Sequence, residues 1–340
     1  MALTINTNVS SLIAQRNLQA ATNALNTSIE RMTTGYKINH AADNAAGYSI
    51  ANLWETQLGS LDIAADNAAT GADMLTTAEE TYGLLTSHLQ RVRDLTEQAA
   101  NGTYGSASLK AIQSEVVARL QEVNRIAANS EFNGIKLMAF TANGDGSGIT
   151  TNGVNLQVGL YADANSTINL SSDLFSDASL AGIFTDLPDE ENSAKSFAEL
   201  ITTAGGTVAD LASDDADTKQ AALEAFAAAC CGLKYIDETT MYLQADPDNG
   251  AKEMLAYLDA GIDELSGRVT AIGAAQNRVE SALTSLDVQS QNITSSLSTL
   301  RDTDVAEESS NYIQAQILQQ ASATLLSTAN QLPSIALNLI

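Results

Sequence analysis

The sequence has few of the residues on which enzymes and disulfide-rich domains depend. Among 340 residues there are two cysteines, two histidines and three prolines. Cys230 and Cys231 are adjacent, which excludes a disulfide framework and a CxxC metal or redox pair, so we interpret them as buried small residues. Neither His40 nor His88 has a metal-ligand companion at helical spacing. HExxH, GxSxG and Walker-type loops are absent, so we expect no metal, no cofactor and no enzymatic activity.

Positive charge and long apolar runs are also scarce. The chain has 16 basic and 41 acidic residues, a net charge of −25. Without a basic stripe to neutralise phosphates, nucleic acid and acidic membranes are poor partners. No apolar run approaches the 18 or so residues of a membrane span. The first residues, MALTINTNVSS, have neither a basic region nor an apolar core, so we expect no cleavable secretory signal.

Both ends of this acidic chain lack charge almost completely. Arg16 is the only charged residue before Glu30, and none occurs from 309 to 340. Each end has an apolar stripe at helical spacing, surrounded by Gln, Ser, Asn and Thr, which suits burial on several sides in a dense assembly. The predicted self-assembly residues are Leu12, Ile13, Leu25, Ile29, Ile313, Ile317, Leu318, Leu325, Leu332 and Leu337. Because one partner helix covers only part of a stripe, we expect both ends to be disordered in the monomer and to fold on assembly. A terminal helix docked on its own domain is the alternative.

Between the ends, the low content of proline and aromatics indicates a mainly α fold of long, packed helices. One helix is predicted to start after Asp43 and run to about Ala100, and a shorter one covers 109–126. Alternating residues at 154–160 fit a strand, with 167–170 as a possible partner. Residues 255–300 carry a sustained heptad stripe that is polar only at Gln276 and Ser290, typical of a coiled-coil-like helix. This helix would be roughly 75 Å long, too long to pack on a compact globule. Its packing partners are therefore predicted to be the helices of the N-terminal half, so the chain folds back on itself.

Residues 186–250 differ in amino-acid composition from the rest of the chain. Acidic residues far outnumber the three basic ones, and Gly205-Gly206 and Pro247 interrupt the segment. Helical runs such as 217–229 indicate a small, mainly helical insertion with a solvated outer face. We expect its deletion, with a short linker, to preserve assembly.

Several motifs together resemble those of bacterial flagellins, the subunits of the flagellar filament. In the N-terminal half they are INTNVSSL (5–12), ERMTTGYKINHAADNAAGYSIA (30–51), LQRVRDLTEQAANGT (89–103) and SEFNGIKLM (130–138). In the C-terminal part they are AQNRVESAL (275–283), AQILQQA (315–321) and ANQLPSIALNLI (329–340). The resemblance covers about 1–180 and 250–340, and both ends occur in the family's order.

The resemblance implies a domain plan and a set of partners. It implies an inner coiled-coil domain from 1–43 and 301–340, a helical rod with a β-hairpin from 44–185 and 251–300, and a variable outer insertion at 186–250. It implies type III export, an export chaperone, filament cap and hook-junction proteins, and a secreted, extracellular filament that serves swimming motility. One alternative is a hook–filament junction protein, which the ANQLPSIALNLI ending disfavours. The other is a different coiled-coil secretion-apparatus subunit, which the long N-terminal match disfavours.

The resemblance also implies a receptor site. Flagellins sensed by the flagellin-recognising Toll-like receptor carry an Arg and a Leu in a QRVRxL segment and a Glu on the next helix. The matching residues are Arg91, Leu95 and Glu115, with Asp94 where Glu is common. Contacts between neighbouring rods are an alternative role for the same residues.

Overall fold

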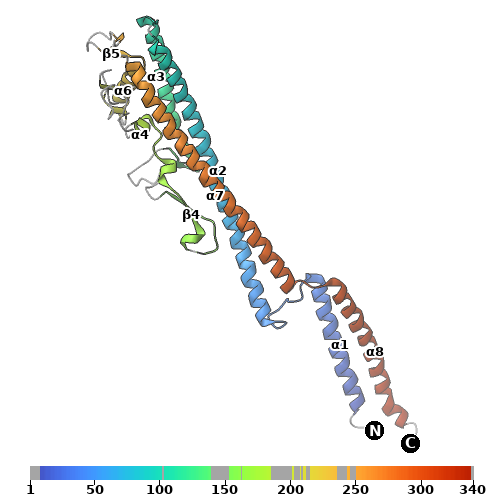
Figure 1. The fold of residues 1–340 in the computed structure, drawn as a ribbon. Coiled ribbons are helices and arrows are strands. Elements are labelled where there is room, and N and C mark those ends of the chain that lie inside the picture. The colour runs from blue at the N-terminus through green and yellow to red at the C-terminus, as the bar shows by residue number, and fades with distance from the viewer. Residues whose placement is uncertain are drawn as a thin grey trace. The chain divides into compact units, whose positions relative to one another are not determined.

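The computed structural model describes residues 8–101, 103–138, 153–161, 163–184, 201–202, 207, 210–211, 215–235, 243–245 and 250–337. The chain divides into two units, one made of 1–62 and 287–340 and the other of 63–286. The helices are α1 (Val9–Thr34), α2 (Ala45–Ala100), α3 (Ser106–Asn129), α4 (Leu180–Phe184), α6 (Ala216–Cys230), α7 (Gly250–Arg301) and α8 (Val305–Leu337), with 3₁₀ turns η1 (Ala164–Ser166) and η2 (Ser172–Phe175). The mainly α fold expected from the sequence is confirmed (Figure 1).

Short antiparallel strand pairs complete the described structure. They are β1 (Glu131–Phe132) with β2 (Ile135–Lys136), β3 (Val154–Gln157) with β4 (Thr167–Leu170), and β5 (Leu233–Tyr235) with β6 (Leu243–Ala245). The predicted partner of the 154–160 strand is thus confirmed, with Val154 opposite Leu170. Gly71 of α2 allows this hairpin to approach closely, because a Cβ there would lie 2.3 Å from Cδ1 of Leu156.

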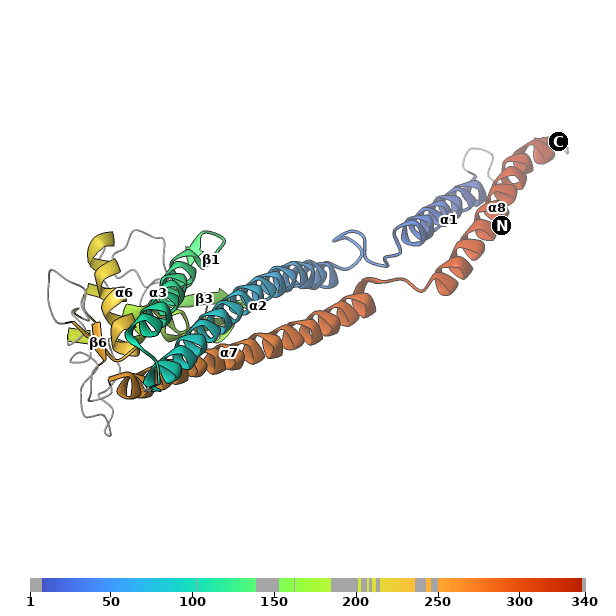
Figure 2. The ribbon, with the colours of Figure 1, turned by 90° about the horizontal axis from the view of Figure 1, so that it is seen from above.

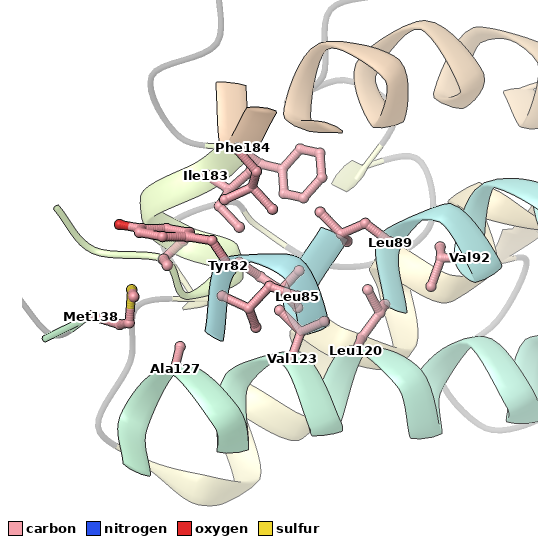
Figure 3. Packing of buried hydrophobic residues seen from close by; sticks show 14 of the residues in the cluster. Tyr82, Leu85, Leu89, Val92, Leu120, Val123, Ala127, Met138, Ile183 and Phe184 are labelled. Carbon is pink, nitrogen blue, oxygen red and sulfur yellow. The ribbon is translucent and has the colours of Figure 1, made fainter. Parts of the chain in front are cut away.

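The core of unit 63–286 lies between α2, α3 and α7. Apolar residues at three-four spacing along α2 and α7, such as Tyr82, Leu89 and Leu265, are fully buried in it. Figure 3 shows Leu120 and Val123 of α3 packed against the α2 residues of this core. Tyr82 donates its hydroxyl to the carbonyl oxygens of Leu174 and Ser176, at 3.1 and 3.4 Å, so its one polar atom is satisfied inside the apolar cluster.

Helix α6 belongs to the acidic segment that we interpreted as a solvated insertion, and it packs directly on α3. Leu223, Phe226 and Cys230 are buried in the same core as α2 and α7. The Phe226 ring meets Phe184 of α4 edge to face, with centroids 5.2 Å apart. The helical run 217–229 is therefore confirmed, but most of it is not solvated. Every residue from Ala222 to Cys230 except Glu224 is buried, and the exposed side chains lie in the first part of the helix. Where the domain boundaries fall stays a prediction.

In the other unit, α1 and α8 lie side by side and antiparallel (Figures 1 and 2). The amide of Asn8 donates to the carbonyl of Ala329 at 2.6 Å, and Arg31 lies 3.8 Å from Glu308 at the opposite end. Asn8 caps α1 by accepting from the Ser11 amide, and Gly35 ends the helix with a φ of 77°. The sequence led us to expect disorder at both ends in a single chain, whereas the structure has both as helices, each covering part of the other.

Candidate assembly surface

Among the described side chains of α1 and α8, those that are buried are small or polar. The buried positions of α1 repeat every seven residues, at Ala14, Ala21 and Ser28. Those of α8 repeat in the same way, at Glu308, Ala315, Ser322 and Ala329. We call the six alanine and serine residues of this set the small-residue seam. Small residues let two helices approach closely, but they remove little apolar area from water.

The large apolar side chains of the pair point away from the seam. We call these exposed residues the assembly surface: Val9, Leu12, Ile13, Ile29 and Met32 of α1, and Val305, Ile313, Ile317, Leu318 and Leu325 of α8. Ile317 and Leu325 are 60% and 62% exposed. An ordinary amphipathic pair has the reverse arrangement, with large residues between the helices and polar ones outside. Large apolar residues exposed in such number on one helix pair indicate interaction with other molecules.

Most of the self-assembly residues predicted from the sequence lie on this surface. Leu12, Ile13 and Ile29 of α1 are exposed, as are Ile313, Ile317, Leu318 and Leu325 of α8, while Leu25 is half-buried. The side chains of Leu332 and Leu337 lie outside the described residues. Their roles in assembly remain predictions. A shallow groove lined by Ile313, Ile317 and Leu318 runs along α8.

Some exposed apolar residues of this unit were not predicted from the sequence. Ile50 fits the three-four alternation of apolar residues along α2, which predicts a buried position, but it is 42% exposed, and Leu53 and Val288 are exposed as well. The three-four alternation failed at Ile50 because the apolar residues near the start of α2 occupy more than one face. A helix that is apolar on two faces was the signal that would have revealed them.

The three residues expected to bind a receptor lie in unit 63–286, on neighbouring helices. Nε and Nη2 of Arg91 on α2 donate to one carboxylate oxygen of Glu115 on α3, at 3.0 and 2.9 Å. Both side chains are partly exposed. Arg119 lies 3.9 Å from the same oxygen, so Glu115 faces two cations. Leu95 is only 2% exposed and belongs to the core, so it does not form the apolar centre of a surface patch. Its position four residues on from Arg91 is offset by about 40° around α2.

The remaining chemistry of the described residues is sparse. No group of three or more His, Cys, Asp or Glu side chains in the described part of the chain is arranged to hold a metal ion. None of the helices, as far as they are described, is long and apolar enough to cross a membrane. Cys230 and Cys231 are free and buried, as interpreted from the sequence. Burial raises the pKa of the Cys231 thiol to about 12 and also raises that of Cys230.

Two sequence matches identify the family. Residues 5–143 match the bacterial flagellin N-terminal helical region, and residues 255–340 match the bacterial flagellin C-terminal helical region. Along its whole length the chain is 32% identical to polar flagellin F of Vibrio parahaemolyticus and 33% identical to flagellin D of Vibrio anguillarum, with 100% of each chain covered. The chain belongs to the bacterial flagellin family.

Solved structures similar to this flagellin chain include flagellin of Bacillus cereus and FliC of Burkholderia pseudomallei. The first is 20% identical, with a TM-score of 0.39, and the match covers 65% of this chain and 88% of that one. The second is 20% identical, with a TM-score of 0.36, and the match covers 61% and 99%.

Membership of the family defines the general role of the chain. Flagellins are structural proteins that polymerise into the extracellular flagellar filament. The two matched regions contain all ten residues of the assembly surface.

Proposed function

We propose that this flagellin polymerises through the assembly surface, with the outward apolar residues of α1 and α8 buried against neighbouring subunits of an exported, extracellular filament for swimming. The observation that carries the proposal is the reversed α1–α8 pair, with small residues inside and large ones outside. Burying a Val, Leu, Ile or Met side chain contributes roughly 1.5–3 kcal/mol, so the ten residues of the assembly surface favour association strongly. The family's identity as a filament subunit supports this assignment.

The test compares apolar with polar truncations on α8. We expect Ile317→Ala with Leu318→Ala to raise the critical concentration for growth on filament seeds at least about tenfold, because two contacts of more than 1 kcal/mol each are lost. The matched control is Gln316→Ala with Gln320→Ala, which shortens two exposed polar residues on the same helix. Removal of 309–340 should leave a soluble, largely helical monomer. Filament growth by the truncated chain, or equal critical concentrations for both double variants, would refute the proposal.

The alternative, a hook–filament junction protein or another secretion-apparatus subunit, is not favoured. Relatives that align over the whole chain are named flagellins. Electron microscopy of the salted-out protein distinguishes the two, because a filament subunit forms long polymers alone and a junction protein does not.

We further infer that an export chaperone covers the assembly surface before export, and that cap and hook-junction proteins receive the subunit at the filament. The support is the exposed groove of Ile313, Ile317 and Leu318, which an unassembled chain would present to other proteins. A purified chaperone should bind the full chain and should fail to bind a chain that lacks 309–340. Equal binding to both would place the chaperone site elsewhere.

We also infer that the monomer binds the flagellin-sensing Toll-like receptor of animals through Arg91 and Glu115. The doubly hydrogen-bonded arginine–carboxylate pair supports this inference, because two adjacent helices hold both charges in fixed positions at the surface. Arg91→Ala and Glu115→Ala should each weaken binding of the receptor ectodomain by about 1–2 kcal/mol, as in hot-spot truncations. Intact filaments should bind far less if neighbouring rods cover the same face. Unchanged affinity in both variants would show that Arg91 and Glu115 do not bind the receptor.

Leu95 needs a separate control, because its side chain is buried. Leu95→Ala should weaken receptor binding only indirectly, by loosening the support of Arg91. Leu89→Ala removes an equally buried leucine from the same helix. If both variants lose the same affinity, Leu95 acts through stability alone, and a larger loss for Leu95→Ala would assign it a direct role.

A further inference from the structure

The small-residue seam leaves the register of α1 against α8 poorly specified by packing alone. Its alanines and serines recur every seven residues on both helices. A slip of one helix by seven residues therefore again places small residues opposite small residues. Repeats of this kind need a distinct polar or charged contact to define one register. Register matters because it decides which large residues of α1 lie beside which of α8 on the assembly surface.

Few polar contacts are described between α1 and α8 themselves. Besides the hydrogen bond of Asn8, Ser11 contacts Asn330 at 2.7 Å and Gln319 contacts Thr22 at 3.2 Å. Such exposed or half-buried hydrogen bonds contribute little net stability. Near the other end, Glu308 is buried in the seam and Arg31 lies 3.8 Å away.

A denser set of contacts joins the two chain segments where α1 ends and α8 begins. The Lys37 amide donates to the carbonyl of Arg301 at 2.7 Å, and the Thr303 amide donates to the carbonyl of Gly35 at 2.9 Å. These bonds flank an antiparallel bridge between Tyr36 and Asp302. Two backbone bonds of this type cannot both form if the segments shift by even one residue.

Side chains reinforce this backbone pair. The Arg301 guanidinium lies 4.2 Å from the centroid of the Tyr36 ring, and its Nη1 lies 3.1 Å from Glu55. Lys37 donates its Nζ to the carbonyl of Thr299 at 2.8 Å. The arginine is mostly buried, and desolvation strengthens a cation–π contact. We call Tyr36, Lys37, Glu55 and Arg301 the linker clasp.

We propose that the linker clasp fixes the register of α1 against α8 and so gives the assembly surface a single geometry. Gly35 follows the last residue of α1 directly, and only Asp304 separates Thr303 from α8. So short a connection cannot absorb a seven-residue slip, which is about 10 Å along a helix. Pairing starts at the clasp and extends toward Asn8 and Ala329. This inference rests on the proposed function in so far as the surface it defines is the one that polymerises.

The test measures register directly by disulfide trapping, in a chain whose two native cysteines are replaced by alanine. Thr22→Cys with Gln319→Cys reports the observed register, and Thr22→Cys with Leu326→Cys or Tyr312→Cys reports slips of seven residues. With the clasp intact, only the first pair should form an intramolecular disulfide. In an Arg301→Ala or Tyr36→Leu background, the slipped pairs should form as well. Arg301→Lys keeps the charge and should give an intermediate result.

The second readout is assembly. Arg301→Ala should raise the critical concentration on filament seeds about two- to thirtyfold, the range expected for loss of a cation–π contact. Arg278→Ala removes an exposed arginine from the same helix and should have no effect. Circular dichroism verifies that each variant is folded. If only the native-register cysteine pair forms a disulfide in both Arg301→Ala and Tyr36→Leu, the linker clasp does not fix the register. If the parent chain fails to polymerise, the proposed function is wrong instead. Disulfide trapping in the monomer still tests whether the linker clasp fixes the register.

Discussion

The packing of α6 leads to a prediction that opposes what the acidic sequence of 186–250 suggested. If this segment is a separable outer insertion, losing one of its side chains should leave the rest of the protein unaffected. In the structure, Phe226 of α6 is fully buried in the core shared with α2, α3 and α7, and its ring contacts Phe184. Phe226→Ala should therefore destabilise unit 63–286 as a whole.

The magnitude follows from the burial of the ring. Truncation of a buried phenylalanine costs about 3–5 kcal/mol, which includes the cavity that is left. The edge-to-face contact with Phe184 contributes about 0.5–1.5 kcal/mol of this. For a unit of this size, each kcal/mol lowers the melting temperature by roughly 2–4 °C, so we expect a decrease of about 6–20 °C.

The assay is thermal and urea unfolding of the full-length monomer, followed by far-UV circular dichroism below the critical concentration. Tyr161→Ala is the matched control, because this aromatic residue is 64% exposed and its loss should change stability by less than about 0.5 kcal/mol. A loss below about 1 kcal/mol for Phe226→Ala would refute the placement of α6 in the core. It would also restore the expectation that 186–250 can be deleted without harm, whereas the structure indicates that deleting α6 uncovers part of α3.

Three further predictions address the seam, the core tyrosine and the thiols. Ala21→Leu should overpack the small-residue seam, which lowers the free energy of unfolding by about 1–3 kcal/mol and reduces native-register disulfide trapping. Ala20→Leu, at an exposed neighbouring position, should change neither quantity. Equal trapping in both variants would argue against a closely packed seam. Tyr82→Phe should cost about 1–2 kcal/mol in urea unfolding, because the carbonyls of Leu174 and Ser176 lose their buried donor, and an unchanged midpoint would show that water replaces it. Cys230 and Cys231 should resist a thiol reagent at pH 8 in the native protein and react in urea, and rapid native labelling would contradict their burial. Because folding raises their pKa values, the stability they contribute is complete below the unfolded pKa of about 9 and is lost as pH rises toward 12.

The sequence alone determined the helical elements and the kind of protein. Sustained apolar periodicity predicted the long helices α2 and α7, and the shift to alternating residues at 154–160 predicted a strand, because these patterns depend only on local geometry. The absence of charge at both ends indicated surfaces that become buried on assembly, and the ordered motifs indicated the family. None of these inferences required knowledge of which helix touches which.

Only the tertiary structure decided which face of each helix is covered. Periodicity marks an apolar stripe, but it does not say whether large or small residues form the contact. In the α1–α8 pair the alanines and serines lie inside, and residues such as Leu12 and Ile317 are left outside. Likewise, Leu95 and Arg91 are four residues apart in an exposed-looking segment, yet only the packing of α3 buries one and pairs the other with Glu115. The α6 helix, which belongs to an acidic segment, lies in the core because its apolar residues meet α3, and such long-range contacts are not encoded in any local pattern.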